Sequence, residues 1–159
     1  MTRIAFTIFG DAQPQGSTRA FVPAGWKRAI LTSANPKLKS WRQLVTEAAN
    51  VAIARYPEPD RSLMLDGVRL SIAFYMPRPK SLKKTRTAHT TKPDIDKLVR
   101  AICDALSQVV FRDDSQVCEL VTMKHYAAEG KPPRVEVVVE ATAGVLPLTR
   151  HQPLFEQVM

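Results

Sequence analysis

The sequence predicts a single α+β domain in which two helices pack on one face of a mixed β-sheet. Four segments alternate apolar and polar residues, which is typical of strands with one buried face. Two longer segments repeat apolar residues at spacings of three and four, which is typical of amphipathic helices. The length of 159 residues suits one domain with an ordinary hydrophobic core.

The N-terminal part of the chain is predicted to hold a strand, an irregular stretch and a helix. Apolar and polar residues alternate over residues 3–8, which indicates the first strand. Gly10 to Pro36 is rich in Pro, Thr, Ser and basic residues, with short strands expected around Phe21 and Ile30. The spacing of apolar residues then predicts a helix from Leu38 to Arg55.

The middle of the chain repeats this order. Val68 to Met76 has the clearest alternation in the sequence and is predicted to be a strand. A second irregular stretch, Pro77 to Pro93, leads to a helix from about Asp94 to Val109. The apolar side of this helix carries Leu98, Ala101, Ile102, Ala105 and Val109, and its polar side carries Asp96, Lys97, Arg100, Asp104 and Ser107.

The C-terminal part is predicted to contain two further strands and a tail. Gln116 to Tyr126 is rich in residues that favour strands, and valines alternate with polar residues over 134–140. Ala127 to Pro133, with one Gly and a Pro pair, reads as the link between them. We therefore expect a domain over residues 1–141, followed by an extended tail over residues 142–159.

The composition favours a nucleic-acid partner. The chain has 23 Lys and Arg against 15 Asp and Glu, a net charge of +8, which attracts polyanions. It has neither an apolar run of about 18 residues nor a signal-peptide pattern, so we expect a cytoplasmic protein with no membrane partner. Cys103 and Cys118 form no CxxC-type pair, which argues against a disulfide framework or a structural zinc site.

The basic excess is concentrated before and within the second predicted helix. Eight cations fall in this region: Arg78, Lys80, Lys83, Lys84, Arg86, Lys92, Lys97 and Arg100. A charge run is usually only a solvated face, but two carboxylates, Asp94 and Asp96, interrupt this one. The pattern therefore favours a phosphate-binding surface beside an acidic pair. His89 lies in the same stretch and is included among the candidate DNA contacts.

The pair Asp94 and Asp96 is a candidate metal site. In an extended backbone, residues two apart project to the same side. Two adjacent carboxylates repel each other unless a positive group lies between them, and Mg²⁺ needs only one or two carboxylates plus waters and phosphate oxygens. The alternative is structural, with Asp94 capping the helix and Asp96 stabilised by the helix dipole.

A second acidic spot, Asp113 and Asp114, lies between the helix and the next strand. It is either a polar turn or a further source of metal ligands. If the strand that follows lies beside the strand ending at Met76, its start could be brought near the start of the helix, and three carboxylates could then converge on one metal site. Topology alone does not establish that convergence.

These two motifs resemble the core of the RusA-type Holliday-junction resolvases. The matching segments are Lys-Pro-Asp-Ile-Asp-Lys-Leu-Val-Arg-Ala-Ile-Cys-Asp-Ala-Leu over residues 92–106 and Val-Phe-Arg-Asp-Asp-Ser-Gln-Val over residues 110–117. Members of that family typically read Asp-Leu-Asp-Asn-Leu-x-Lys-Ala-x-x-Asp-Ala-Leu, followed by an aromatic-x-Asp-Asp-x-Gln-Val turn. The likeness extends over about residues 4–140 and leaves the tail outside.

The resemblance implies a function and a set of site residues. It implies a small α/β dimer that resolves four-way DNA junctions by paired nicking, in recombination and repair, with Mg²⁺ as cofactor and Mn²⁺ as the substitute. The implied metal-binding, catalytic acids are Asp94, Asp96 and Asp114, while the role of Asp113 stays open. The basic residues from Arg78 to Lys92, together with Lys97, are expected to grip DNA phosphates.

Two positions depart from the family pattern. Lys97 stands where the family usually has Asn, and Arg100 stands where it has a functionally important Lys. Arg100 is one helical turn from Asp96, so the positive charge stays at the site. Because a guanidinium does not readily give up a proton, Arg100 is expected to stabilise charge on the scissile phosphate. The alternative is an intrahelical ion pair with Asp96 or Asp104.

Two other functions stay open on the sequence alone. One is a metal nuclease for flaps or other branched DNA, and the other is a basic DNA-binding protein without catalysis. The tail adds a candidate partner, because the region Gln152 to Phe155 resembles the short peptides that dock onto the sliding clamp. The glutamine stands one place too close to Leu154 for that motif, and the alternative is that Leu154 and Phe155 fold back on the domain.

Overall fold

The computed structural model describes residues 2–142 apart from residues 17, 23, 26, 29, 34, 58, 59 and 84. Four strands form one sheet in the order β1 (Arg3–Phe9), β6 (Arg134–Ala141), β4 (Val68–Met76) and β5 (Val117–Tyr126). β6 is antiparallel to both of its neighbours, whereas β4 and β5 run parallel. The sheet is therefore mixed, as the sequence predicts.

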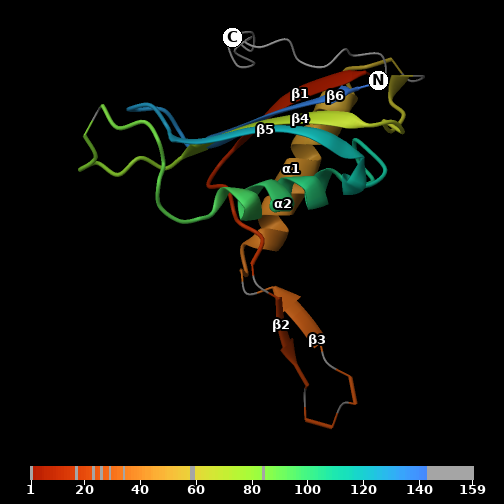
Figure 1. Cartoon of the computed structure of the whole chain (residues 1–159), viewed down its shortest axis with the longest axis horizontal. Coiled ribbons are helices and arrows are strands. Elements are labelled where there is room, and N and C mark those ends of the chain that lie inside the picture. The colour runs from red at the N-terminus through yellow and green to blue at the C-terminus, as the bar shows by residue number, and fades with distance from the viewer. Residues whose placement is uncertain are drawn as a thin grey trace.

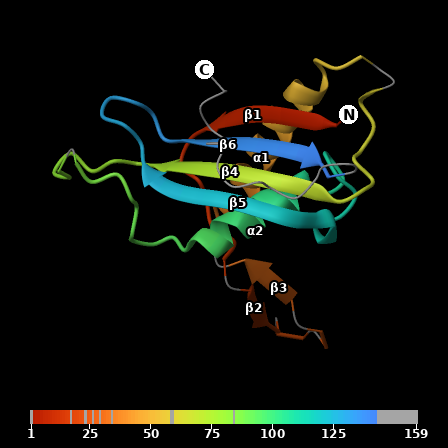
Figure 2. The same cartoon turned by 45° about the horizontal axis from the view of Figure 1, so that its top comes forward.

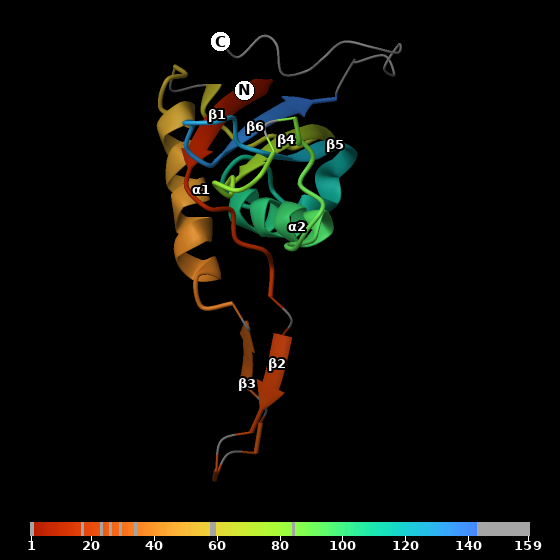
Figure 3. The same ribbon diagram turned by 90° about the vertical axis from the view of Figure 1, so that its left-hand side faces the viewer.

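Both helices, α1 (Leu38–Ile53) and α2 (Ile95–Leu106), lie on the same face of this sheet (Figures 1 and 2). A separate hairpin, β2 (Thr18–Phe21) with β3 (Ile30–Ser33), projects away from the sheet and helices (Figure 3). None of the helices in the described ranges is long and apolar enough to cross a membrane.

The hydrophobic core lies between the helices and the sheet. Alternate residues of β4, from Val68 to Phe74, are fully buried on the helix face because successive strand side chains point to opposite sides. They meet the apolar side of α2, whose fully buried members are Leu98, Ala101, Ile102 and Leu106. The residues that the periodicity selects as apolar faces are thus the ones that build the core.

The unit β4–α2–β5 decides where the functional groups lie. Because β4 and β5 are parallel, α2, which connects them in the chain, runs back along one face of the sheet in the opposite direction (Figure 1). The N-terminus of α2 therefore lies near the end of β4, and its C-terminus lies near the start of β5. A helix of 12 residues is about 18 Å long.

The predicted elements are confirmed, with small differences at their ends. The first helix ends at Ile53, and the second covers Ile95 to Leu106. Gln116 belongs to a 3₁₀ turn, η2 (Asp114–Gln116), that precedes β5. The turn forms because Asp113 accepts a hydrogen bond from the Ser115 N–H while Gln116 accepts one from the Asp113 N–H.

Three sequence-based predictions fall on residues outside the described ranges. They are the DNA contact expected of Lys84, the extended tail beyond Thr142 and the clamp-like segment Gln152 to Phe155. They stay predictions.

Truncation of a core residue in α2 is expected to have a large effect on stability. Leu98 is 0% exposed, so Leu98→Ala should lower the free energy of unfolding by about 2–5 kcal/mol through lost burial and a residual cavity. Leu44 in α1 is 46% exposed, and Leu44→Ala is the matched control, with an expected change within about 0.5 kcal/mol. Denaturant unfolding monitored by circular dichroism measures both. Equal effects would contradict the assignment of this core.

Candidate active site and nucleic-acid interface

Asp94 and Asp96 stand exposed at the N-terminus of α2. Asp94 occupies the N-cap position with an extended backbone, at φ −70° and ψ 141°, yet its side chain makes no capping hydrogen bond. It pairs instead with Lys97, whose Nζ lies 3.1 Å from Asp94 Oδ2. Asp96 has no hydrogen-bond or ion-pair partner within the described part of the chain. The fold therefore uses neither carboxylate as a helix cap.

Nearby lysines lower the pKa of Asp94. The hydrogen bond from Lys97 and the charge of that ammonium hold the pKa of Asp94 below its usual value, with smaller contributions from Lys92 and Lys124. Asp94 is thus an anion at neutral pH.

Lys124 on β5 tethers the segment that leads into the acidic pair. Its ammonium donates to the carbonyl oxygens of Thr91 at 2.8 Å and Pro93 at 2.6 Å. Upstream of these contacts, the Tyr126 N–H donates to the Thr87 carbonyl at 2.7 Å. Together these bonds fix the backbone immediately before Asp94 against the end of the sheet.

His89 belongs to this tether. Its ring packs against Tyr126 with centroids 4.5 Å apart, and its N–H donates to the Lys124 carbonyl at 3.1 Å. Burial, and next the charge of Lys124, lower the pKa of His89 from its usual value, so its ring is neutral at physiological pH. The His89 ring thus packs the loop against β5, and its contact with DNA stays a prediction.

At the second acidic spot, Asp113 and Asp114 have different environments. Asp113 caps η2, and its hydrogen bonds with Ser115 lower the pKa of its carboxyl group. Asp114 is exposed and has no partner within the described residues. Of the two, Asp114 is the carboxylate that the fold leaves available for a ligand.

Asp114 and the pair Asp94 and Asp96 lie at opposite ends of α2. β5 does lie beside β4, but because the two strands are parallel, the start of β5 is near the C-terminus of the helix. In agreement, burial and then the charges of Asp114 and Asp104 raise the pKa of Cys103, in the last turns of α2, to about 11. Among the described residues, no three His, Cys, Asp or Glu side chains are grouped to hold a metal ion. One chain alone does not bring the three acids together.

Arg100 is exposed on α2, and it forms an ion pair with neither Asp96 nor Asp104. Asp104 binds Arg42 of α1 instead. Neither Arg100 nor Asp96 has an ion-pair partner within the described ranges. The intrahelical ion pair that the sequence left open is therefore absent, and the guanidinium faces solvent one turn beyond Asp96.

The basic loop after β4 contains two kinds of cation. The Arg78 guanidinium donates to the carbonyls of Ala127, Lys83 and Arg86, and Arg86 donates to the Thr90 hydroxyl at 2.7 Å. These arginines hold the loop in shape. The described lysines of the region are exposed: Lys80, Lys83, Lys92 and Lys97, the last of which pairs with Asp94.

Lys124 is a residue that the sequence analysis missed, although the sequence carries a signal for it. In register, Lys124 pairs with Phe74, and its neighbours on that face are Thr122 and Tyr126, beside Ile72 and Met76. A lysine at a core-facing position of a strand must find polar partners for its ammonium. The carbonyls of Thr91 and Pro93 are those partners.

The carboxylates at the N-terminus of α2 fit a hard divalent cation. They offer anionic oxygen ligands, and Mg²⁺ takes one or two carboxylates while keeping waters and substrate phosphate oxygens. The adjacent exposed lysines suit a polyanionic substrate. An exposed acidic pair set in a cationic surface is an arrangement typical of enzymes that act on phosphodiesters.

Comparison with known proteins identifies the family. The sequence pattern of the family described as endodeoxyribonuclease RusA matches residues 11–140, and the chain belongs to this family. It is also similar to the uncharacterized protein YqaN of Bacillus subtilis (strain 168), with 34% identity over 149 residues that cover 87% of this chain and 96% of that protein. Membership implies a DNA endonuclease that acts on branched DNA, in a family whose enzymes generally use a divalent metal ion.

Removing the tether should change both the loop and the chemistry. In Lys124→Met, one of the two causes that lower the pKa of His89 is lost, so that pKa should rise while burial keeps it below its usual value. Misplacement of the acidic pair should slow DNA cutting about tenfold or more. An NMR titration of His89 and a cutting assay measure the two effects. Lys39→Met, at an exposed position of α1, is the control. An unchanged pKa of His89 together with an unchanged cutting rate in Lys124→Met would contradict the tethering role of Lys124.

Proposed function

We propose that this protein is a Mg²⁺-dependent endonuclease that resolves four-way DNA junctions by paired nicking, in recombination and repair, with Mn²⁺ as a substitute ion. The observation that carries the proposal is that the carboxylates of Asp94 and Asp96 are exposed and are not used by the fold as helix caps. Both carboxylates are exposed at the start of α2, neither caps the helix, and Lys97 lowers the pKa of Asp94. Lys92, Lys97 and Arg100 lie exposed around them.

In this proposal Asp94, Asp96 and Asp114 hold the ion, which when bound lowers the pKa of a water and neutralises phosphate charge. Lys124 keeps the backbone before Asp94 in place. Arg100 stabilises negative charge on the scissile phosphate without donating its proton. Lys80, Lys83, Lys92 and Lys97 bind backbone phosphates, which position the DNA but carry no base information.

A homodimer is part of the proposal for two reasons. Two coordinated nicks need two sites. In addition, Asp114 lies at the far end of α2 from Asp94 and Asp96, so a three-carboxylate site requires Asp114 from a second copy. A two-fold axis that pairs the α2 helices antiparallel would satisfy this requirement at both sites at once.

The experiment that tests the function compares four-way junctions, flaps and linear duplex as substrates, with Mg²⁺ or with EDTA. Symmetric nicking confined to junctions and abolished by EDTA is the expected result. Cutting of flaps at equal or higher rate would instead identify a nuclease for other branched DNA. Binding without cutting on every substrate would leave the non-catalytic function.

The basic side chains of the loop after β4 should control the salt dependence of DNA binding. Replacing Lys83, Lys84 and Arg86 with Ala should weaken binding to every duplex substrate, because each lost phosphate contact reduces the log–log salt slope by roughly 0.9. Fluorescence anisotropy over a range of salt concentrations measures the slope. The control replaces Lys37, Lys39 and Arg55, exposed residues at α1, with Ala. If the two triple variants have the same slope, the DNA surface lies elsewhere.

A further inference from the structure

The sheet face opposite the two helices presents an ordered row of aromatic and cationic side chains. No helix of the described ranges covers this face, which we term the open face (Figure 1). Strand register places four of its residues side by side across the sheet, at the end where β4 and β5 finish. These residues are Phe9 on β1, Arg134 on β6, Tyr75 on β4 and His125 on β5.

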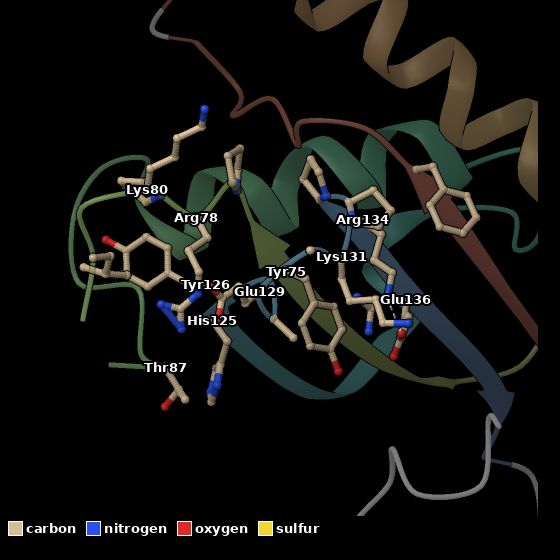
Figure 4. A pocket seen from close by; sticks show the side chains of 18 of the residues that line it. Tyr75, Arg78, Lys80, Thr87, His125, Tyr126, Glu129, Lys131, Arg134 and Glu136 are labelled. Carbon is tan, nitrogen blue, oxygen red and sulfur yellow. Dashed lines mark hydrogen bonds and ion pairs between the residues drawn. The ribbon is translucent and has the colours of Figure 1, made fainter. Parts of the chain in front are cut away.

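This row forms the floor of a hollow of about 1220 Å³. One wall is the start of the loop after β4, including Lys80, and the other is the β5–β6 link, including Lys131 (Figure 4). Arg78 joins the two walls, since its guanidinium donates to the Ala127 carbonyl at 3.0 Å and to the Arg86 carbonyl at 2.8 Å. The hollow is thus a shaped feature of the fold.

The floor offers planar groups for stacking. The Arg134 guanidinium lies 3.9 Å from the centre of the Tyr75 ring and is oriented by Glu136, whose Oε1 is 2.8 Å from Arg134 Nε. On the other side of Arg134 in the row, the Phe9 ring is 64% exposed. A large exposed aromatic ring beside an oriented guanidinium is a surface on which nucleic-acid bases stack.

The charge of the hollow selects for a polyanion. Four basic side chains line it, Arg78, Lys80, Lys131 and Arg134, against two acidic ones, Glu129 and Glu136. A peptide partner would find apolar surface here, but the excess of positive charge favours phosphates. The loop that forms one wall also continues into the acidic pair, so the hollow and Asp94 lie at the same end of the sheet.

We propose that this hollow binds unpaired DNA, with a base stacked on Phe9 and the Arg134 guanidinium and with phosphates held by Lys80 and Lys131. The site is separate from the acidic pair. The proposal rests on the proposed function only for the origin of the strand, which would be a segment unpaired at the branch point. Binding itself needs no metal ion and no cleavage.

The first test measures binding of a fluorescent oligothymidylate of about 12 nucleotides to the full chain in EDTA. Phe9→Ala should weaken binding about fivefold or more, because that factor is the lower limit for stacking of one base on an aromatic ring. Phe9→Trp, which keeps an aromatic ring at this position, should bind like the natural chain. Val51→Ala, which truncates a side chain 61% exposed on α1, is the control and should bind like the natural chain. Equal binding by Phe9→Ala and the natural chain would overturn the proposal.

A second measurement locates the strand and its phosphates. Lys80→Gln and Lys131→Gln should each reduce the salt slope for the oligonucleotide by about 0.7, the value for single strands. A photoreactive thiothymidine oligonucleotide should crosslink to peptides containing Phe9 or Tyr75. Crosslinks confined to α2 would overturn the proposal. So would a loss of self-association in Phe9→Ala with unchanged oligonucleotide binding, since the hollow would then be a protein interface. Because EDTA excludes cutting, none of these results depends on whether the chain resolves junctions.

Discussion

Asp94→Asn and Asp96→Asn are each expected to abolish junction cutting while junction binding stays intact or becomes tighter. In the proposed site each substitution removes an anionic metal ligand, and loss even of groups that only support a ligand typically costs 10- to 100-fold, so we expect a decrease of at least about 100-fold. Each also removes a negative charge from the proposed DNA surface, which favours binding. Both carboxylates are exposed and neither caps α2, so stability should change little. Single-turnover cutting and gel-shift binding measure the two effects.

The second acidic spot offers a contrast between neighbouring residues. Asp114→Asn should also abolish cutting, whereas Asp113→Asn should retain it, because Asn caps a helical turn about as well as Asp. Asp11→Asn, at an exposed position outside the site, is the control. Mixing the Asp96 and Asp114 variants should restore part of the activity if a dimer combines the two ends of α2. Cutting at the natural rate by any of the three acid variants would remove that residue from the site.

The sequence predicts the elements of this fold better than their arrangement. Alternation over Val68 to Met76 correctly indicates which residues join the core between sheet and helices, although Ser71 and Ala73 on the other face of β4 are buried as well. Alternation does not tell which strand lies beside β4 or in which direction that strand runs. The parallel direction of β5 is the one feature that places Asp114 at the far end of α2 from Asp94. Whether the three acids lie close together therefore depends on the direction and neighbours of the strands, which the periodicity of the sequence does not contain.

The site shows the same division. The chemistry-bearing residues Asp94, Asp96 and Arg100 are recognisable from their spacing, since residues at one helical turn share a face. The supporting residue Lys124 and the row from Phe9 to His125 become visible only through strand register, which joins residues far apart in sequence. The cap of η2 is an intermediate case, because an acidic residue followed three positions later by Gln is a capping pattern that the sequence displays.

Arg100 is expected to contribute to cutting through its charge alone. Arg100→Ala should slow junction cutting about 100-fold, the cost of removing one group that stabilises charge in the transition state. Arg100→Lys should stay within about tenfold of the natural rate, because it keeps the positive charge and restores the residue usual in the family. The guanidinium is exposed and has no partner in the described ranges, so neither change should alter the free energy of unfolding by more than about 0.5 kcal/mol.

The comparison of these two variants separates catalysis from structure. Single-turnover rates at saturating protein isolate the cutting step from binding, and thermal unfolding checks the fold. Arg55→Ala, at an exposed position just after α1, removes the same side chain elsewhere and should cut at the natural rate. Cutting at the natural rate by both Arg100→Ala and Arg100→Lys would show that the charge at this position does not act on the scissile phosphate. A rate for Arg100→Lys as low as that of Arg100→Ala would instead show that the planar, bidentate geometry of the guanidinium is required and that charge alone is insufficient.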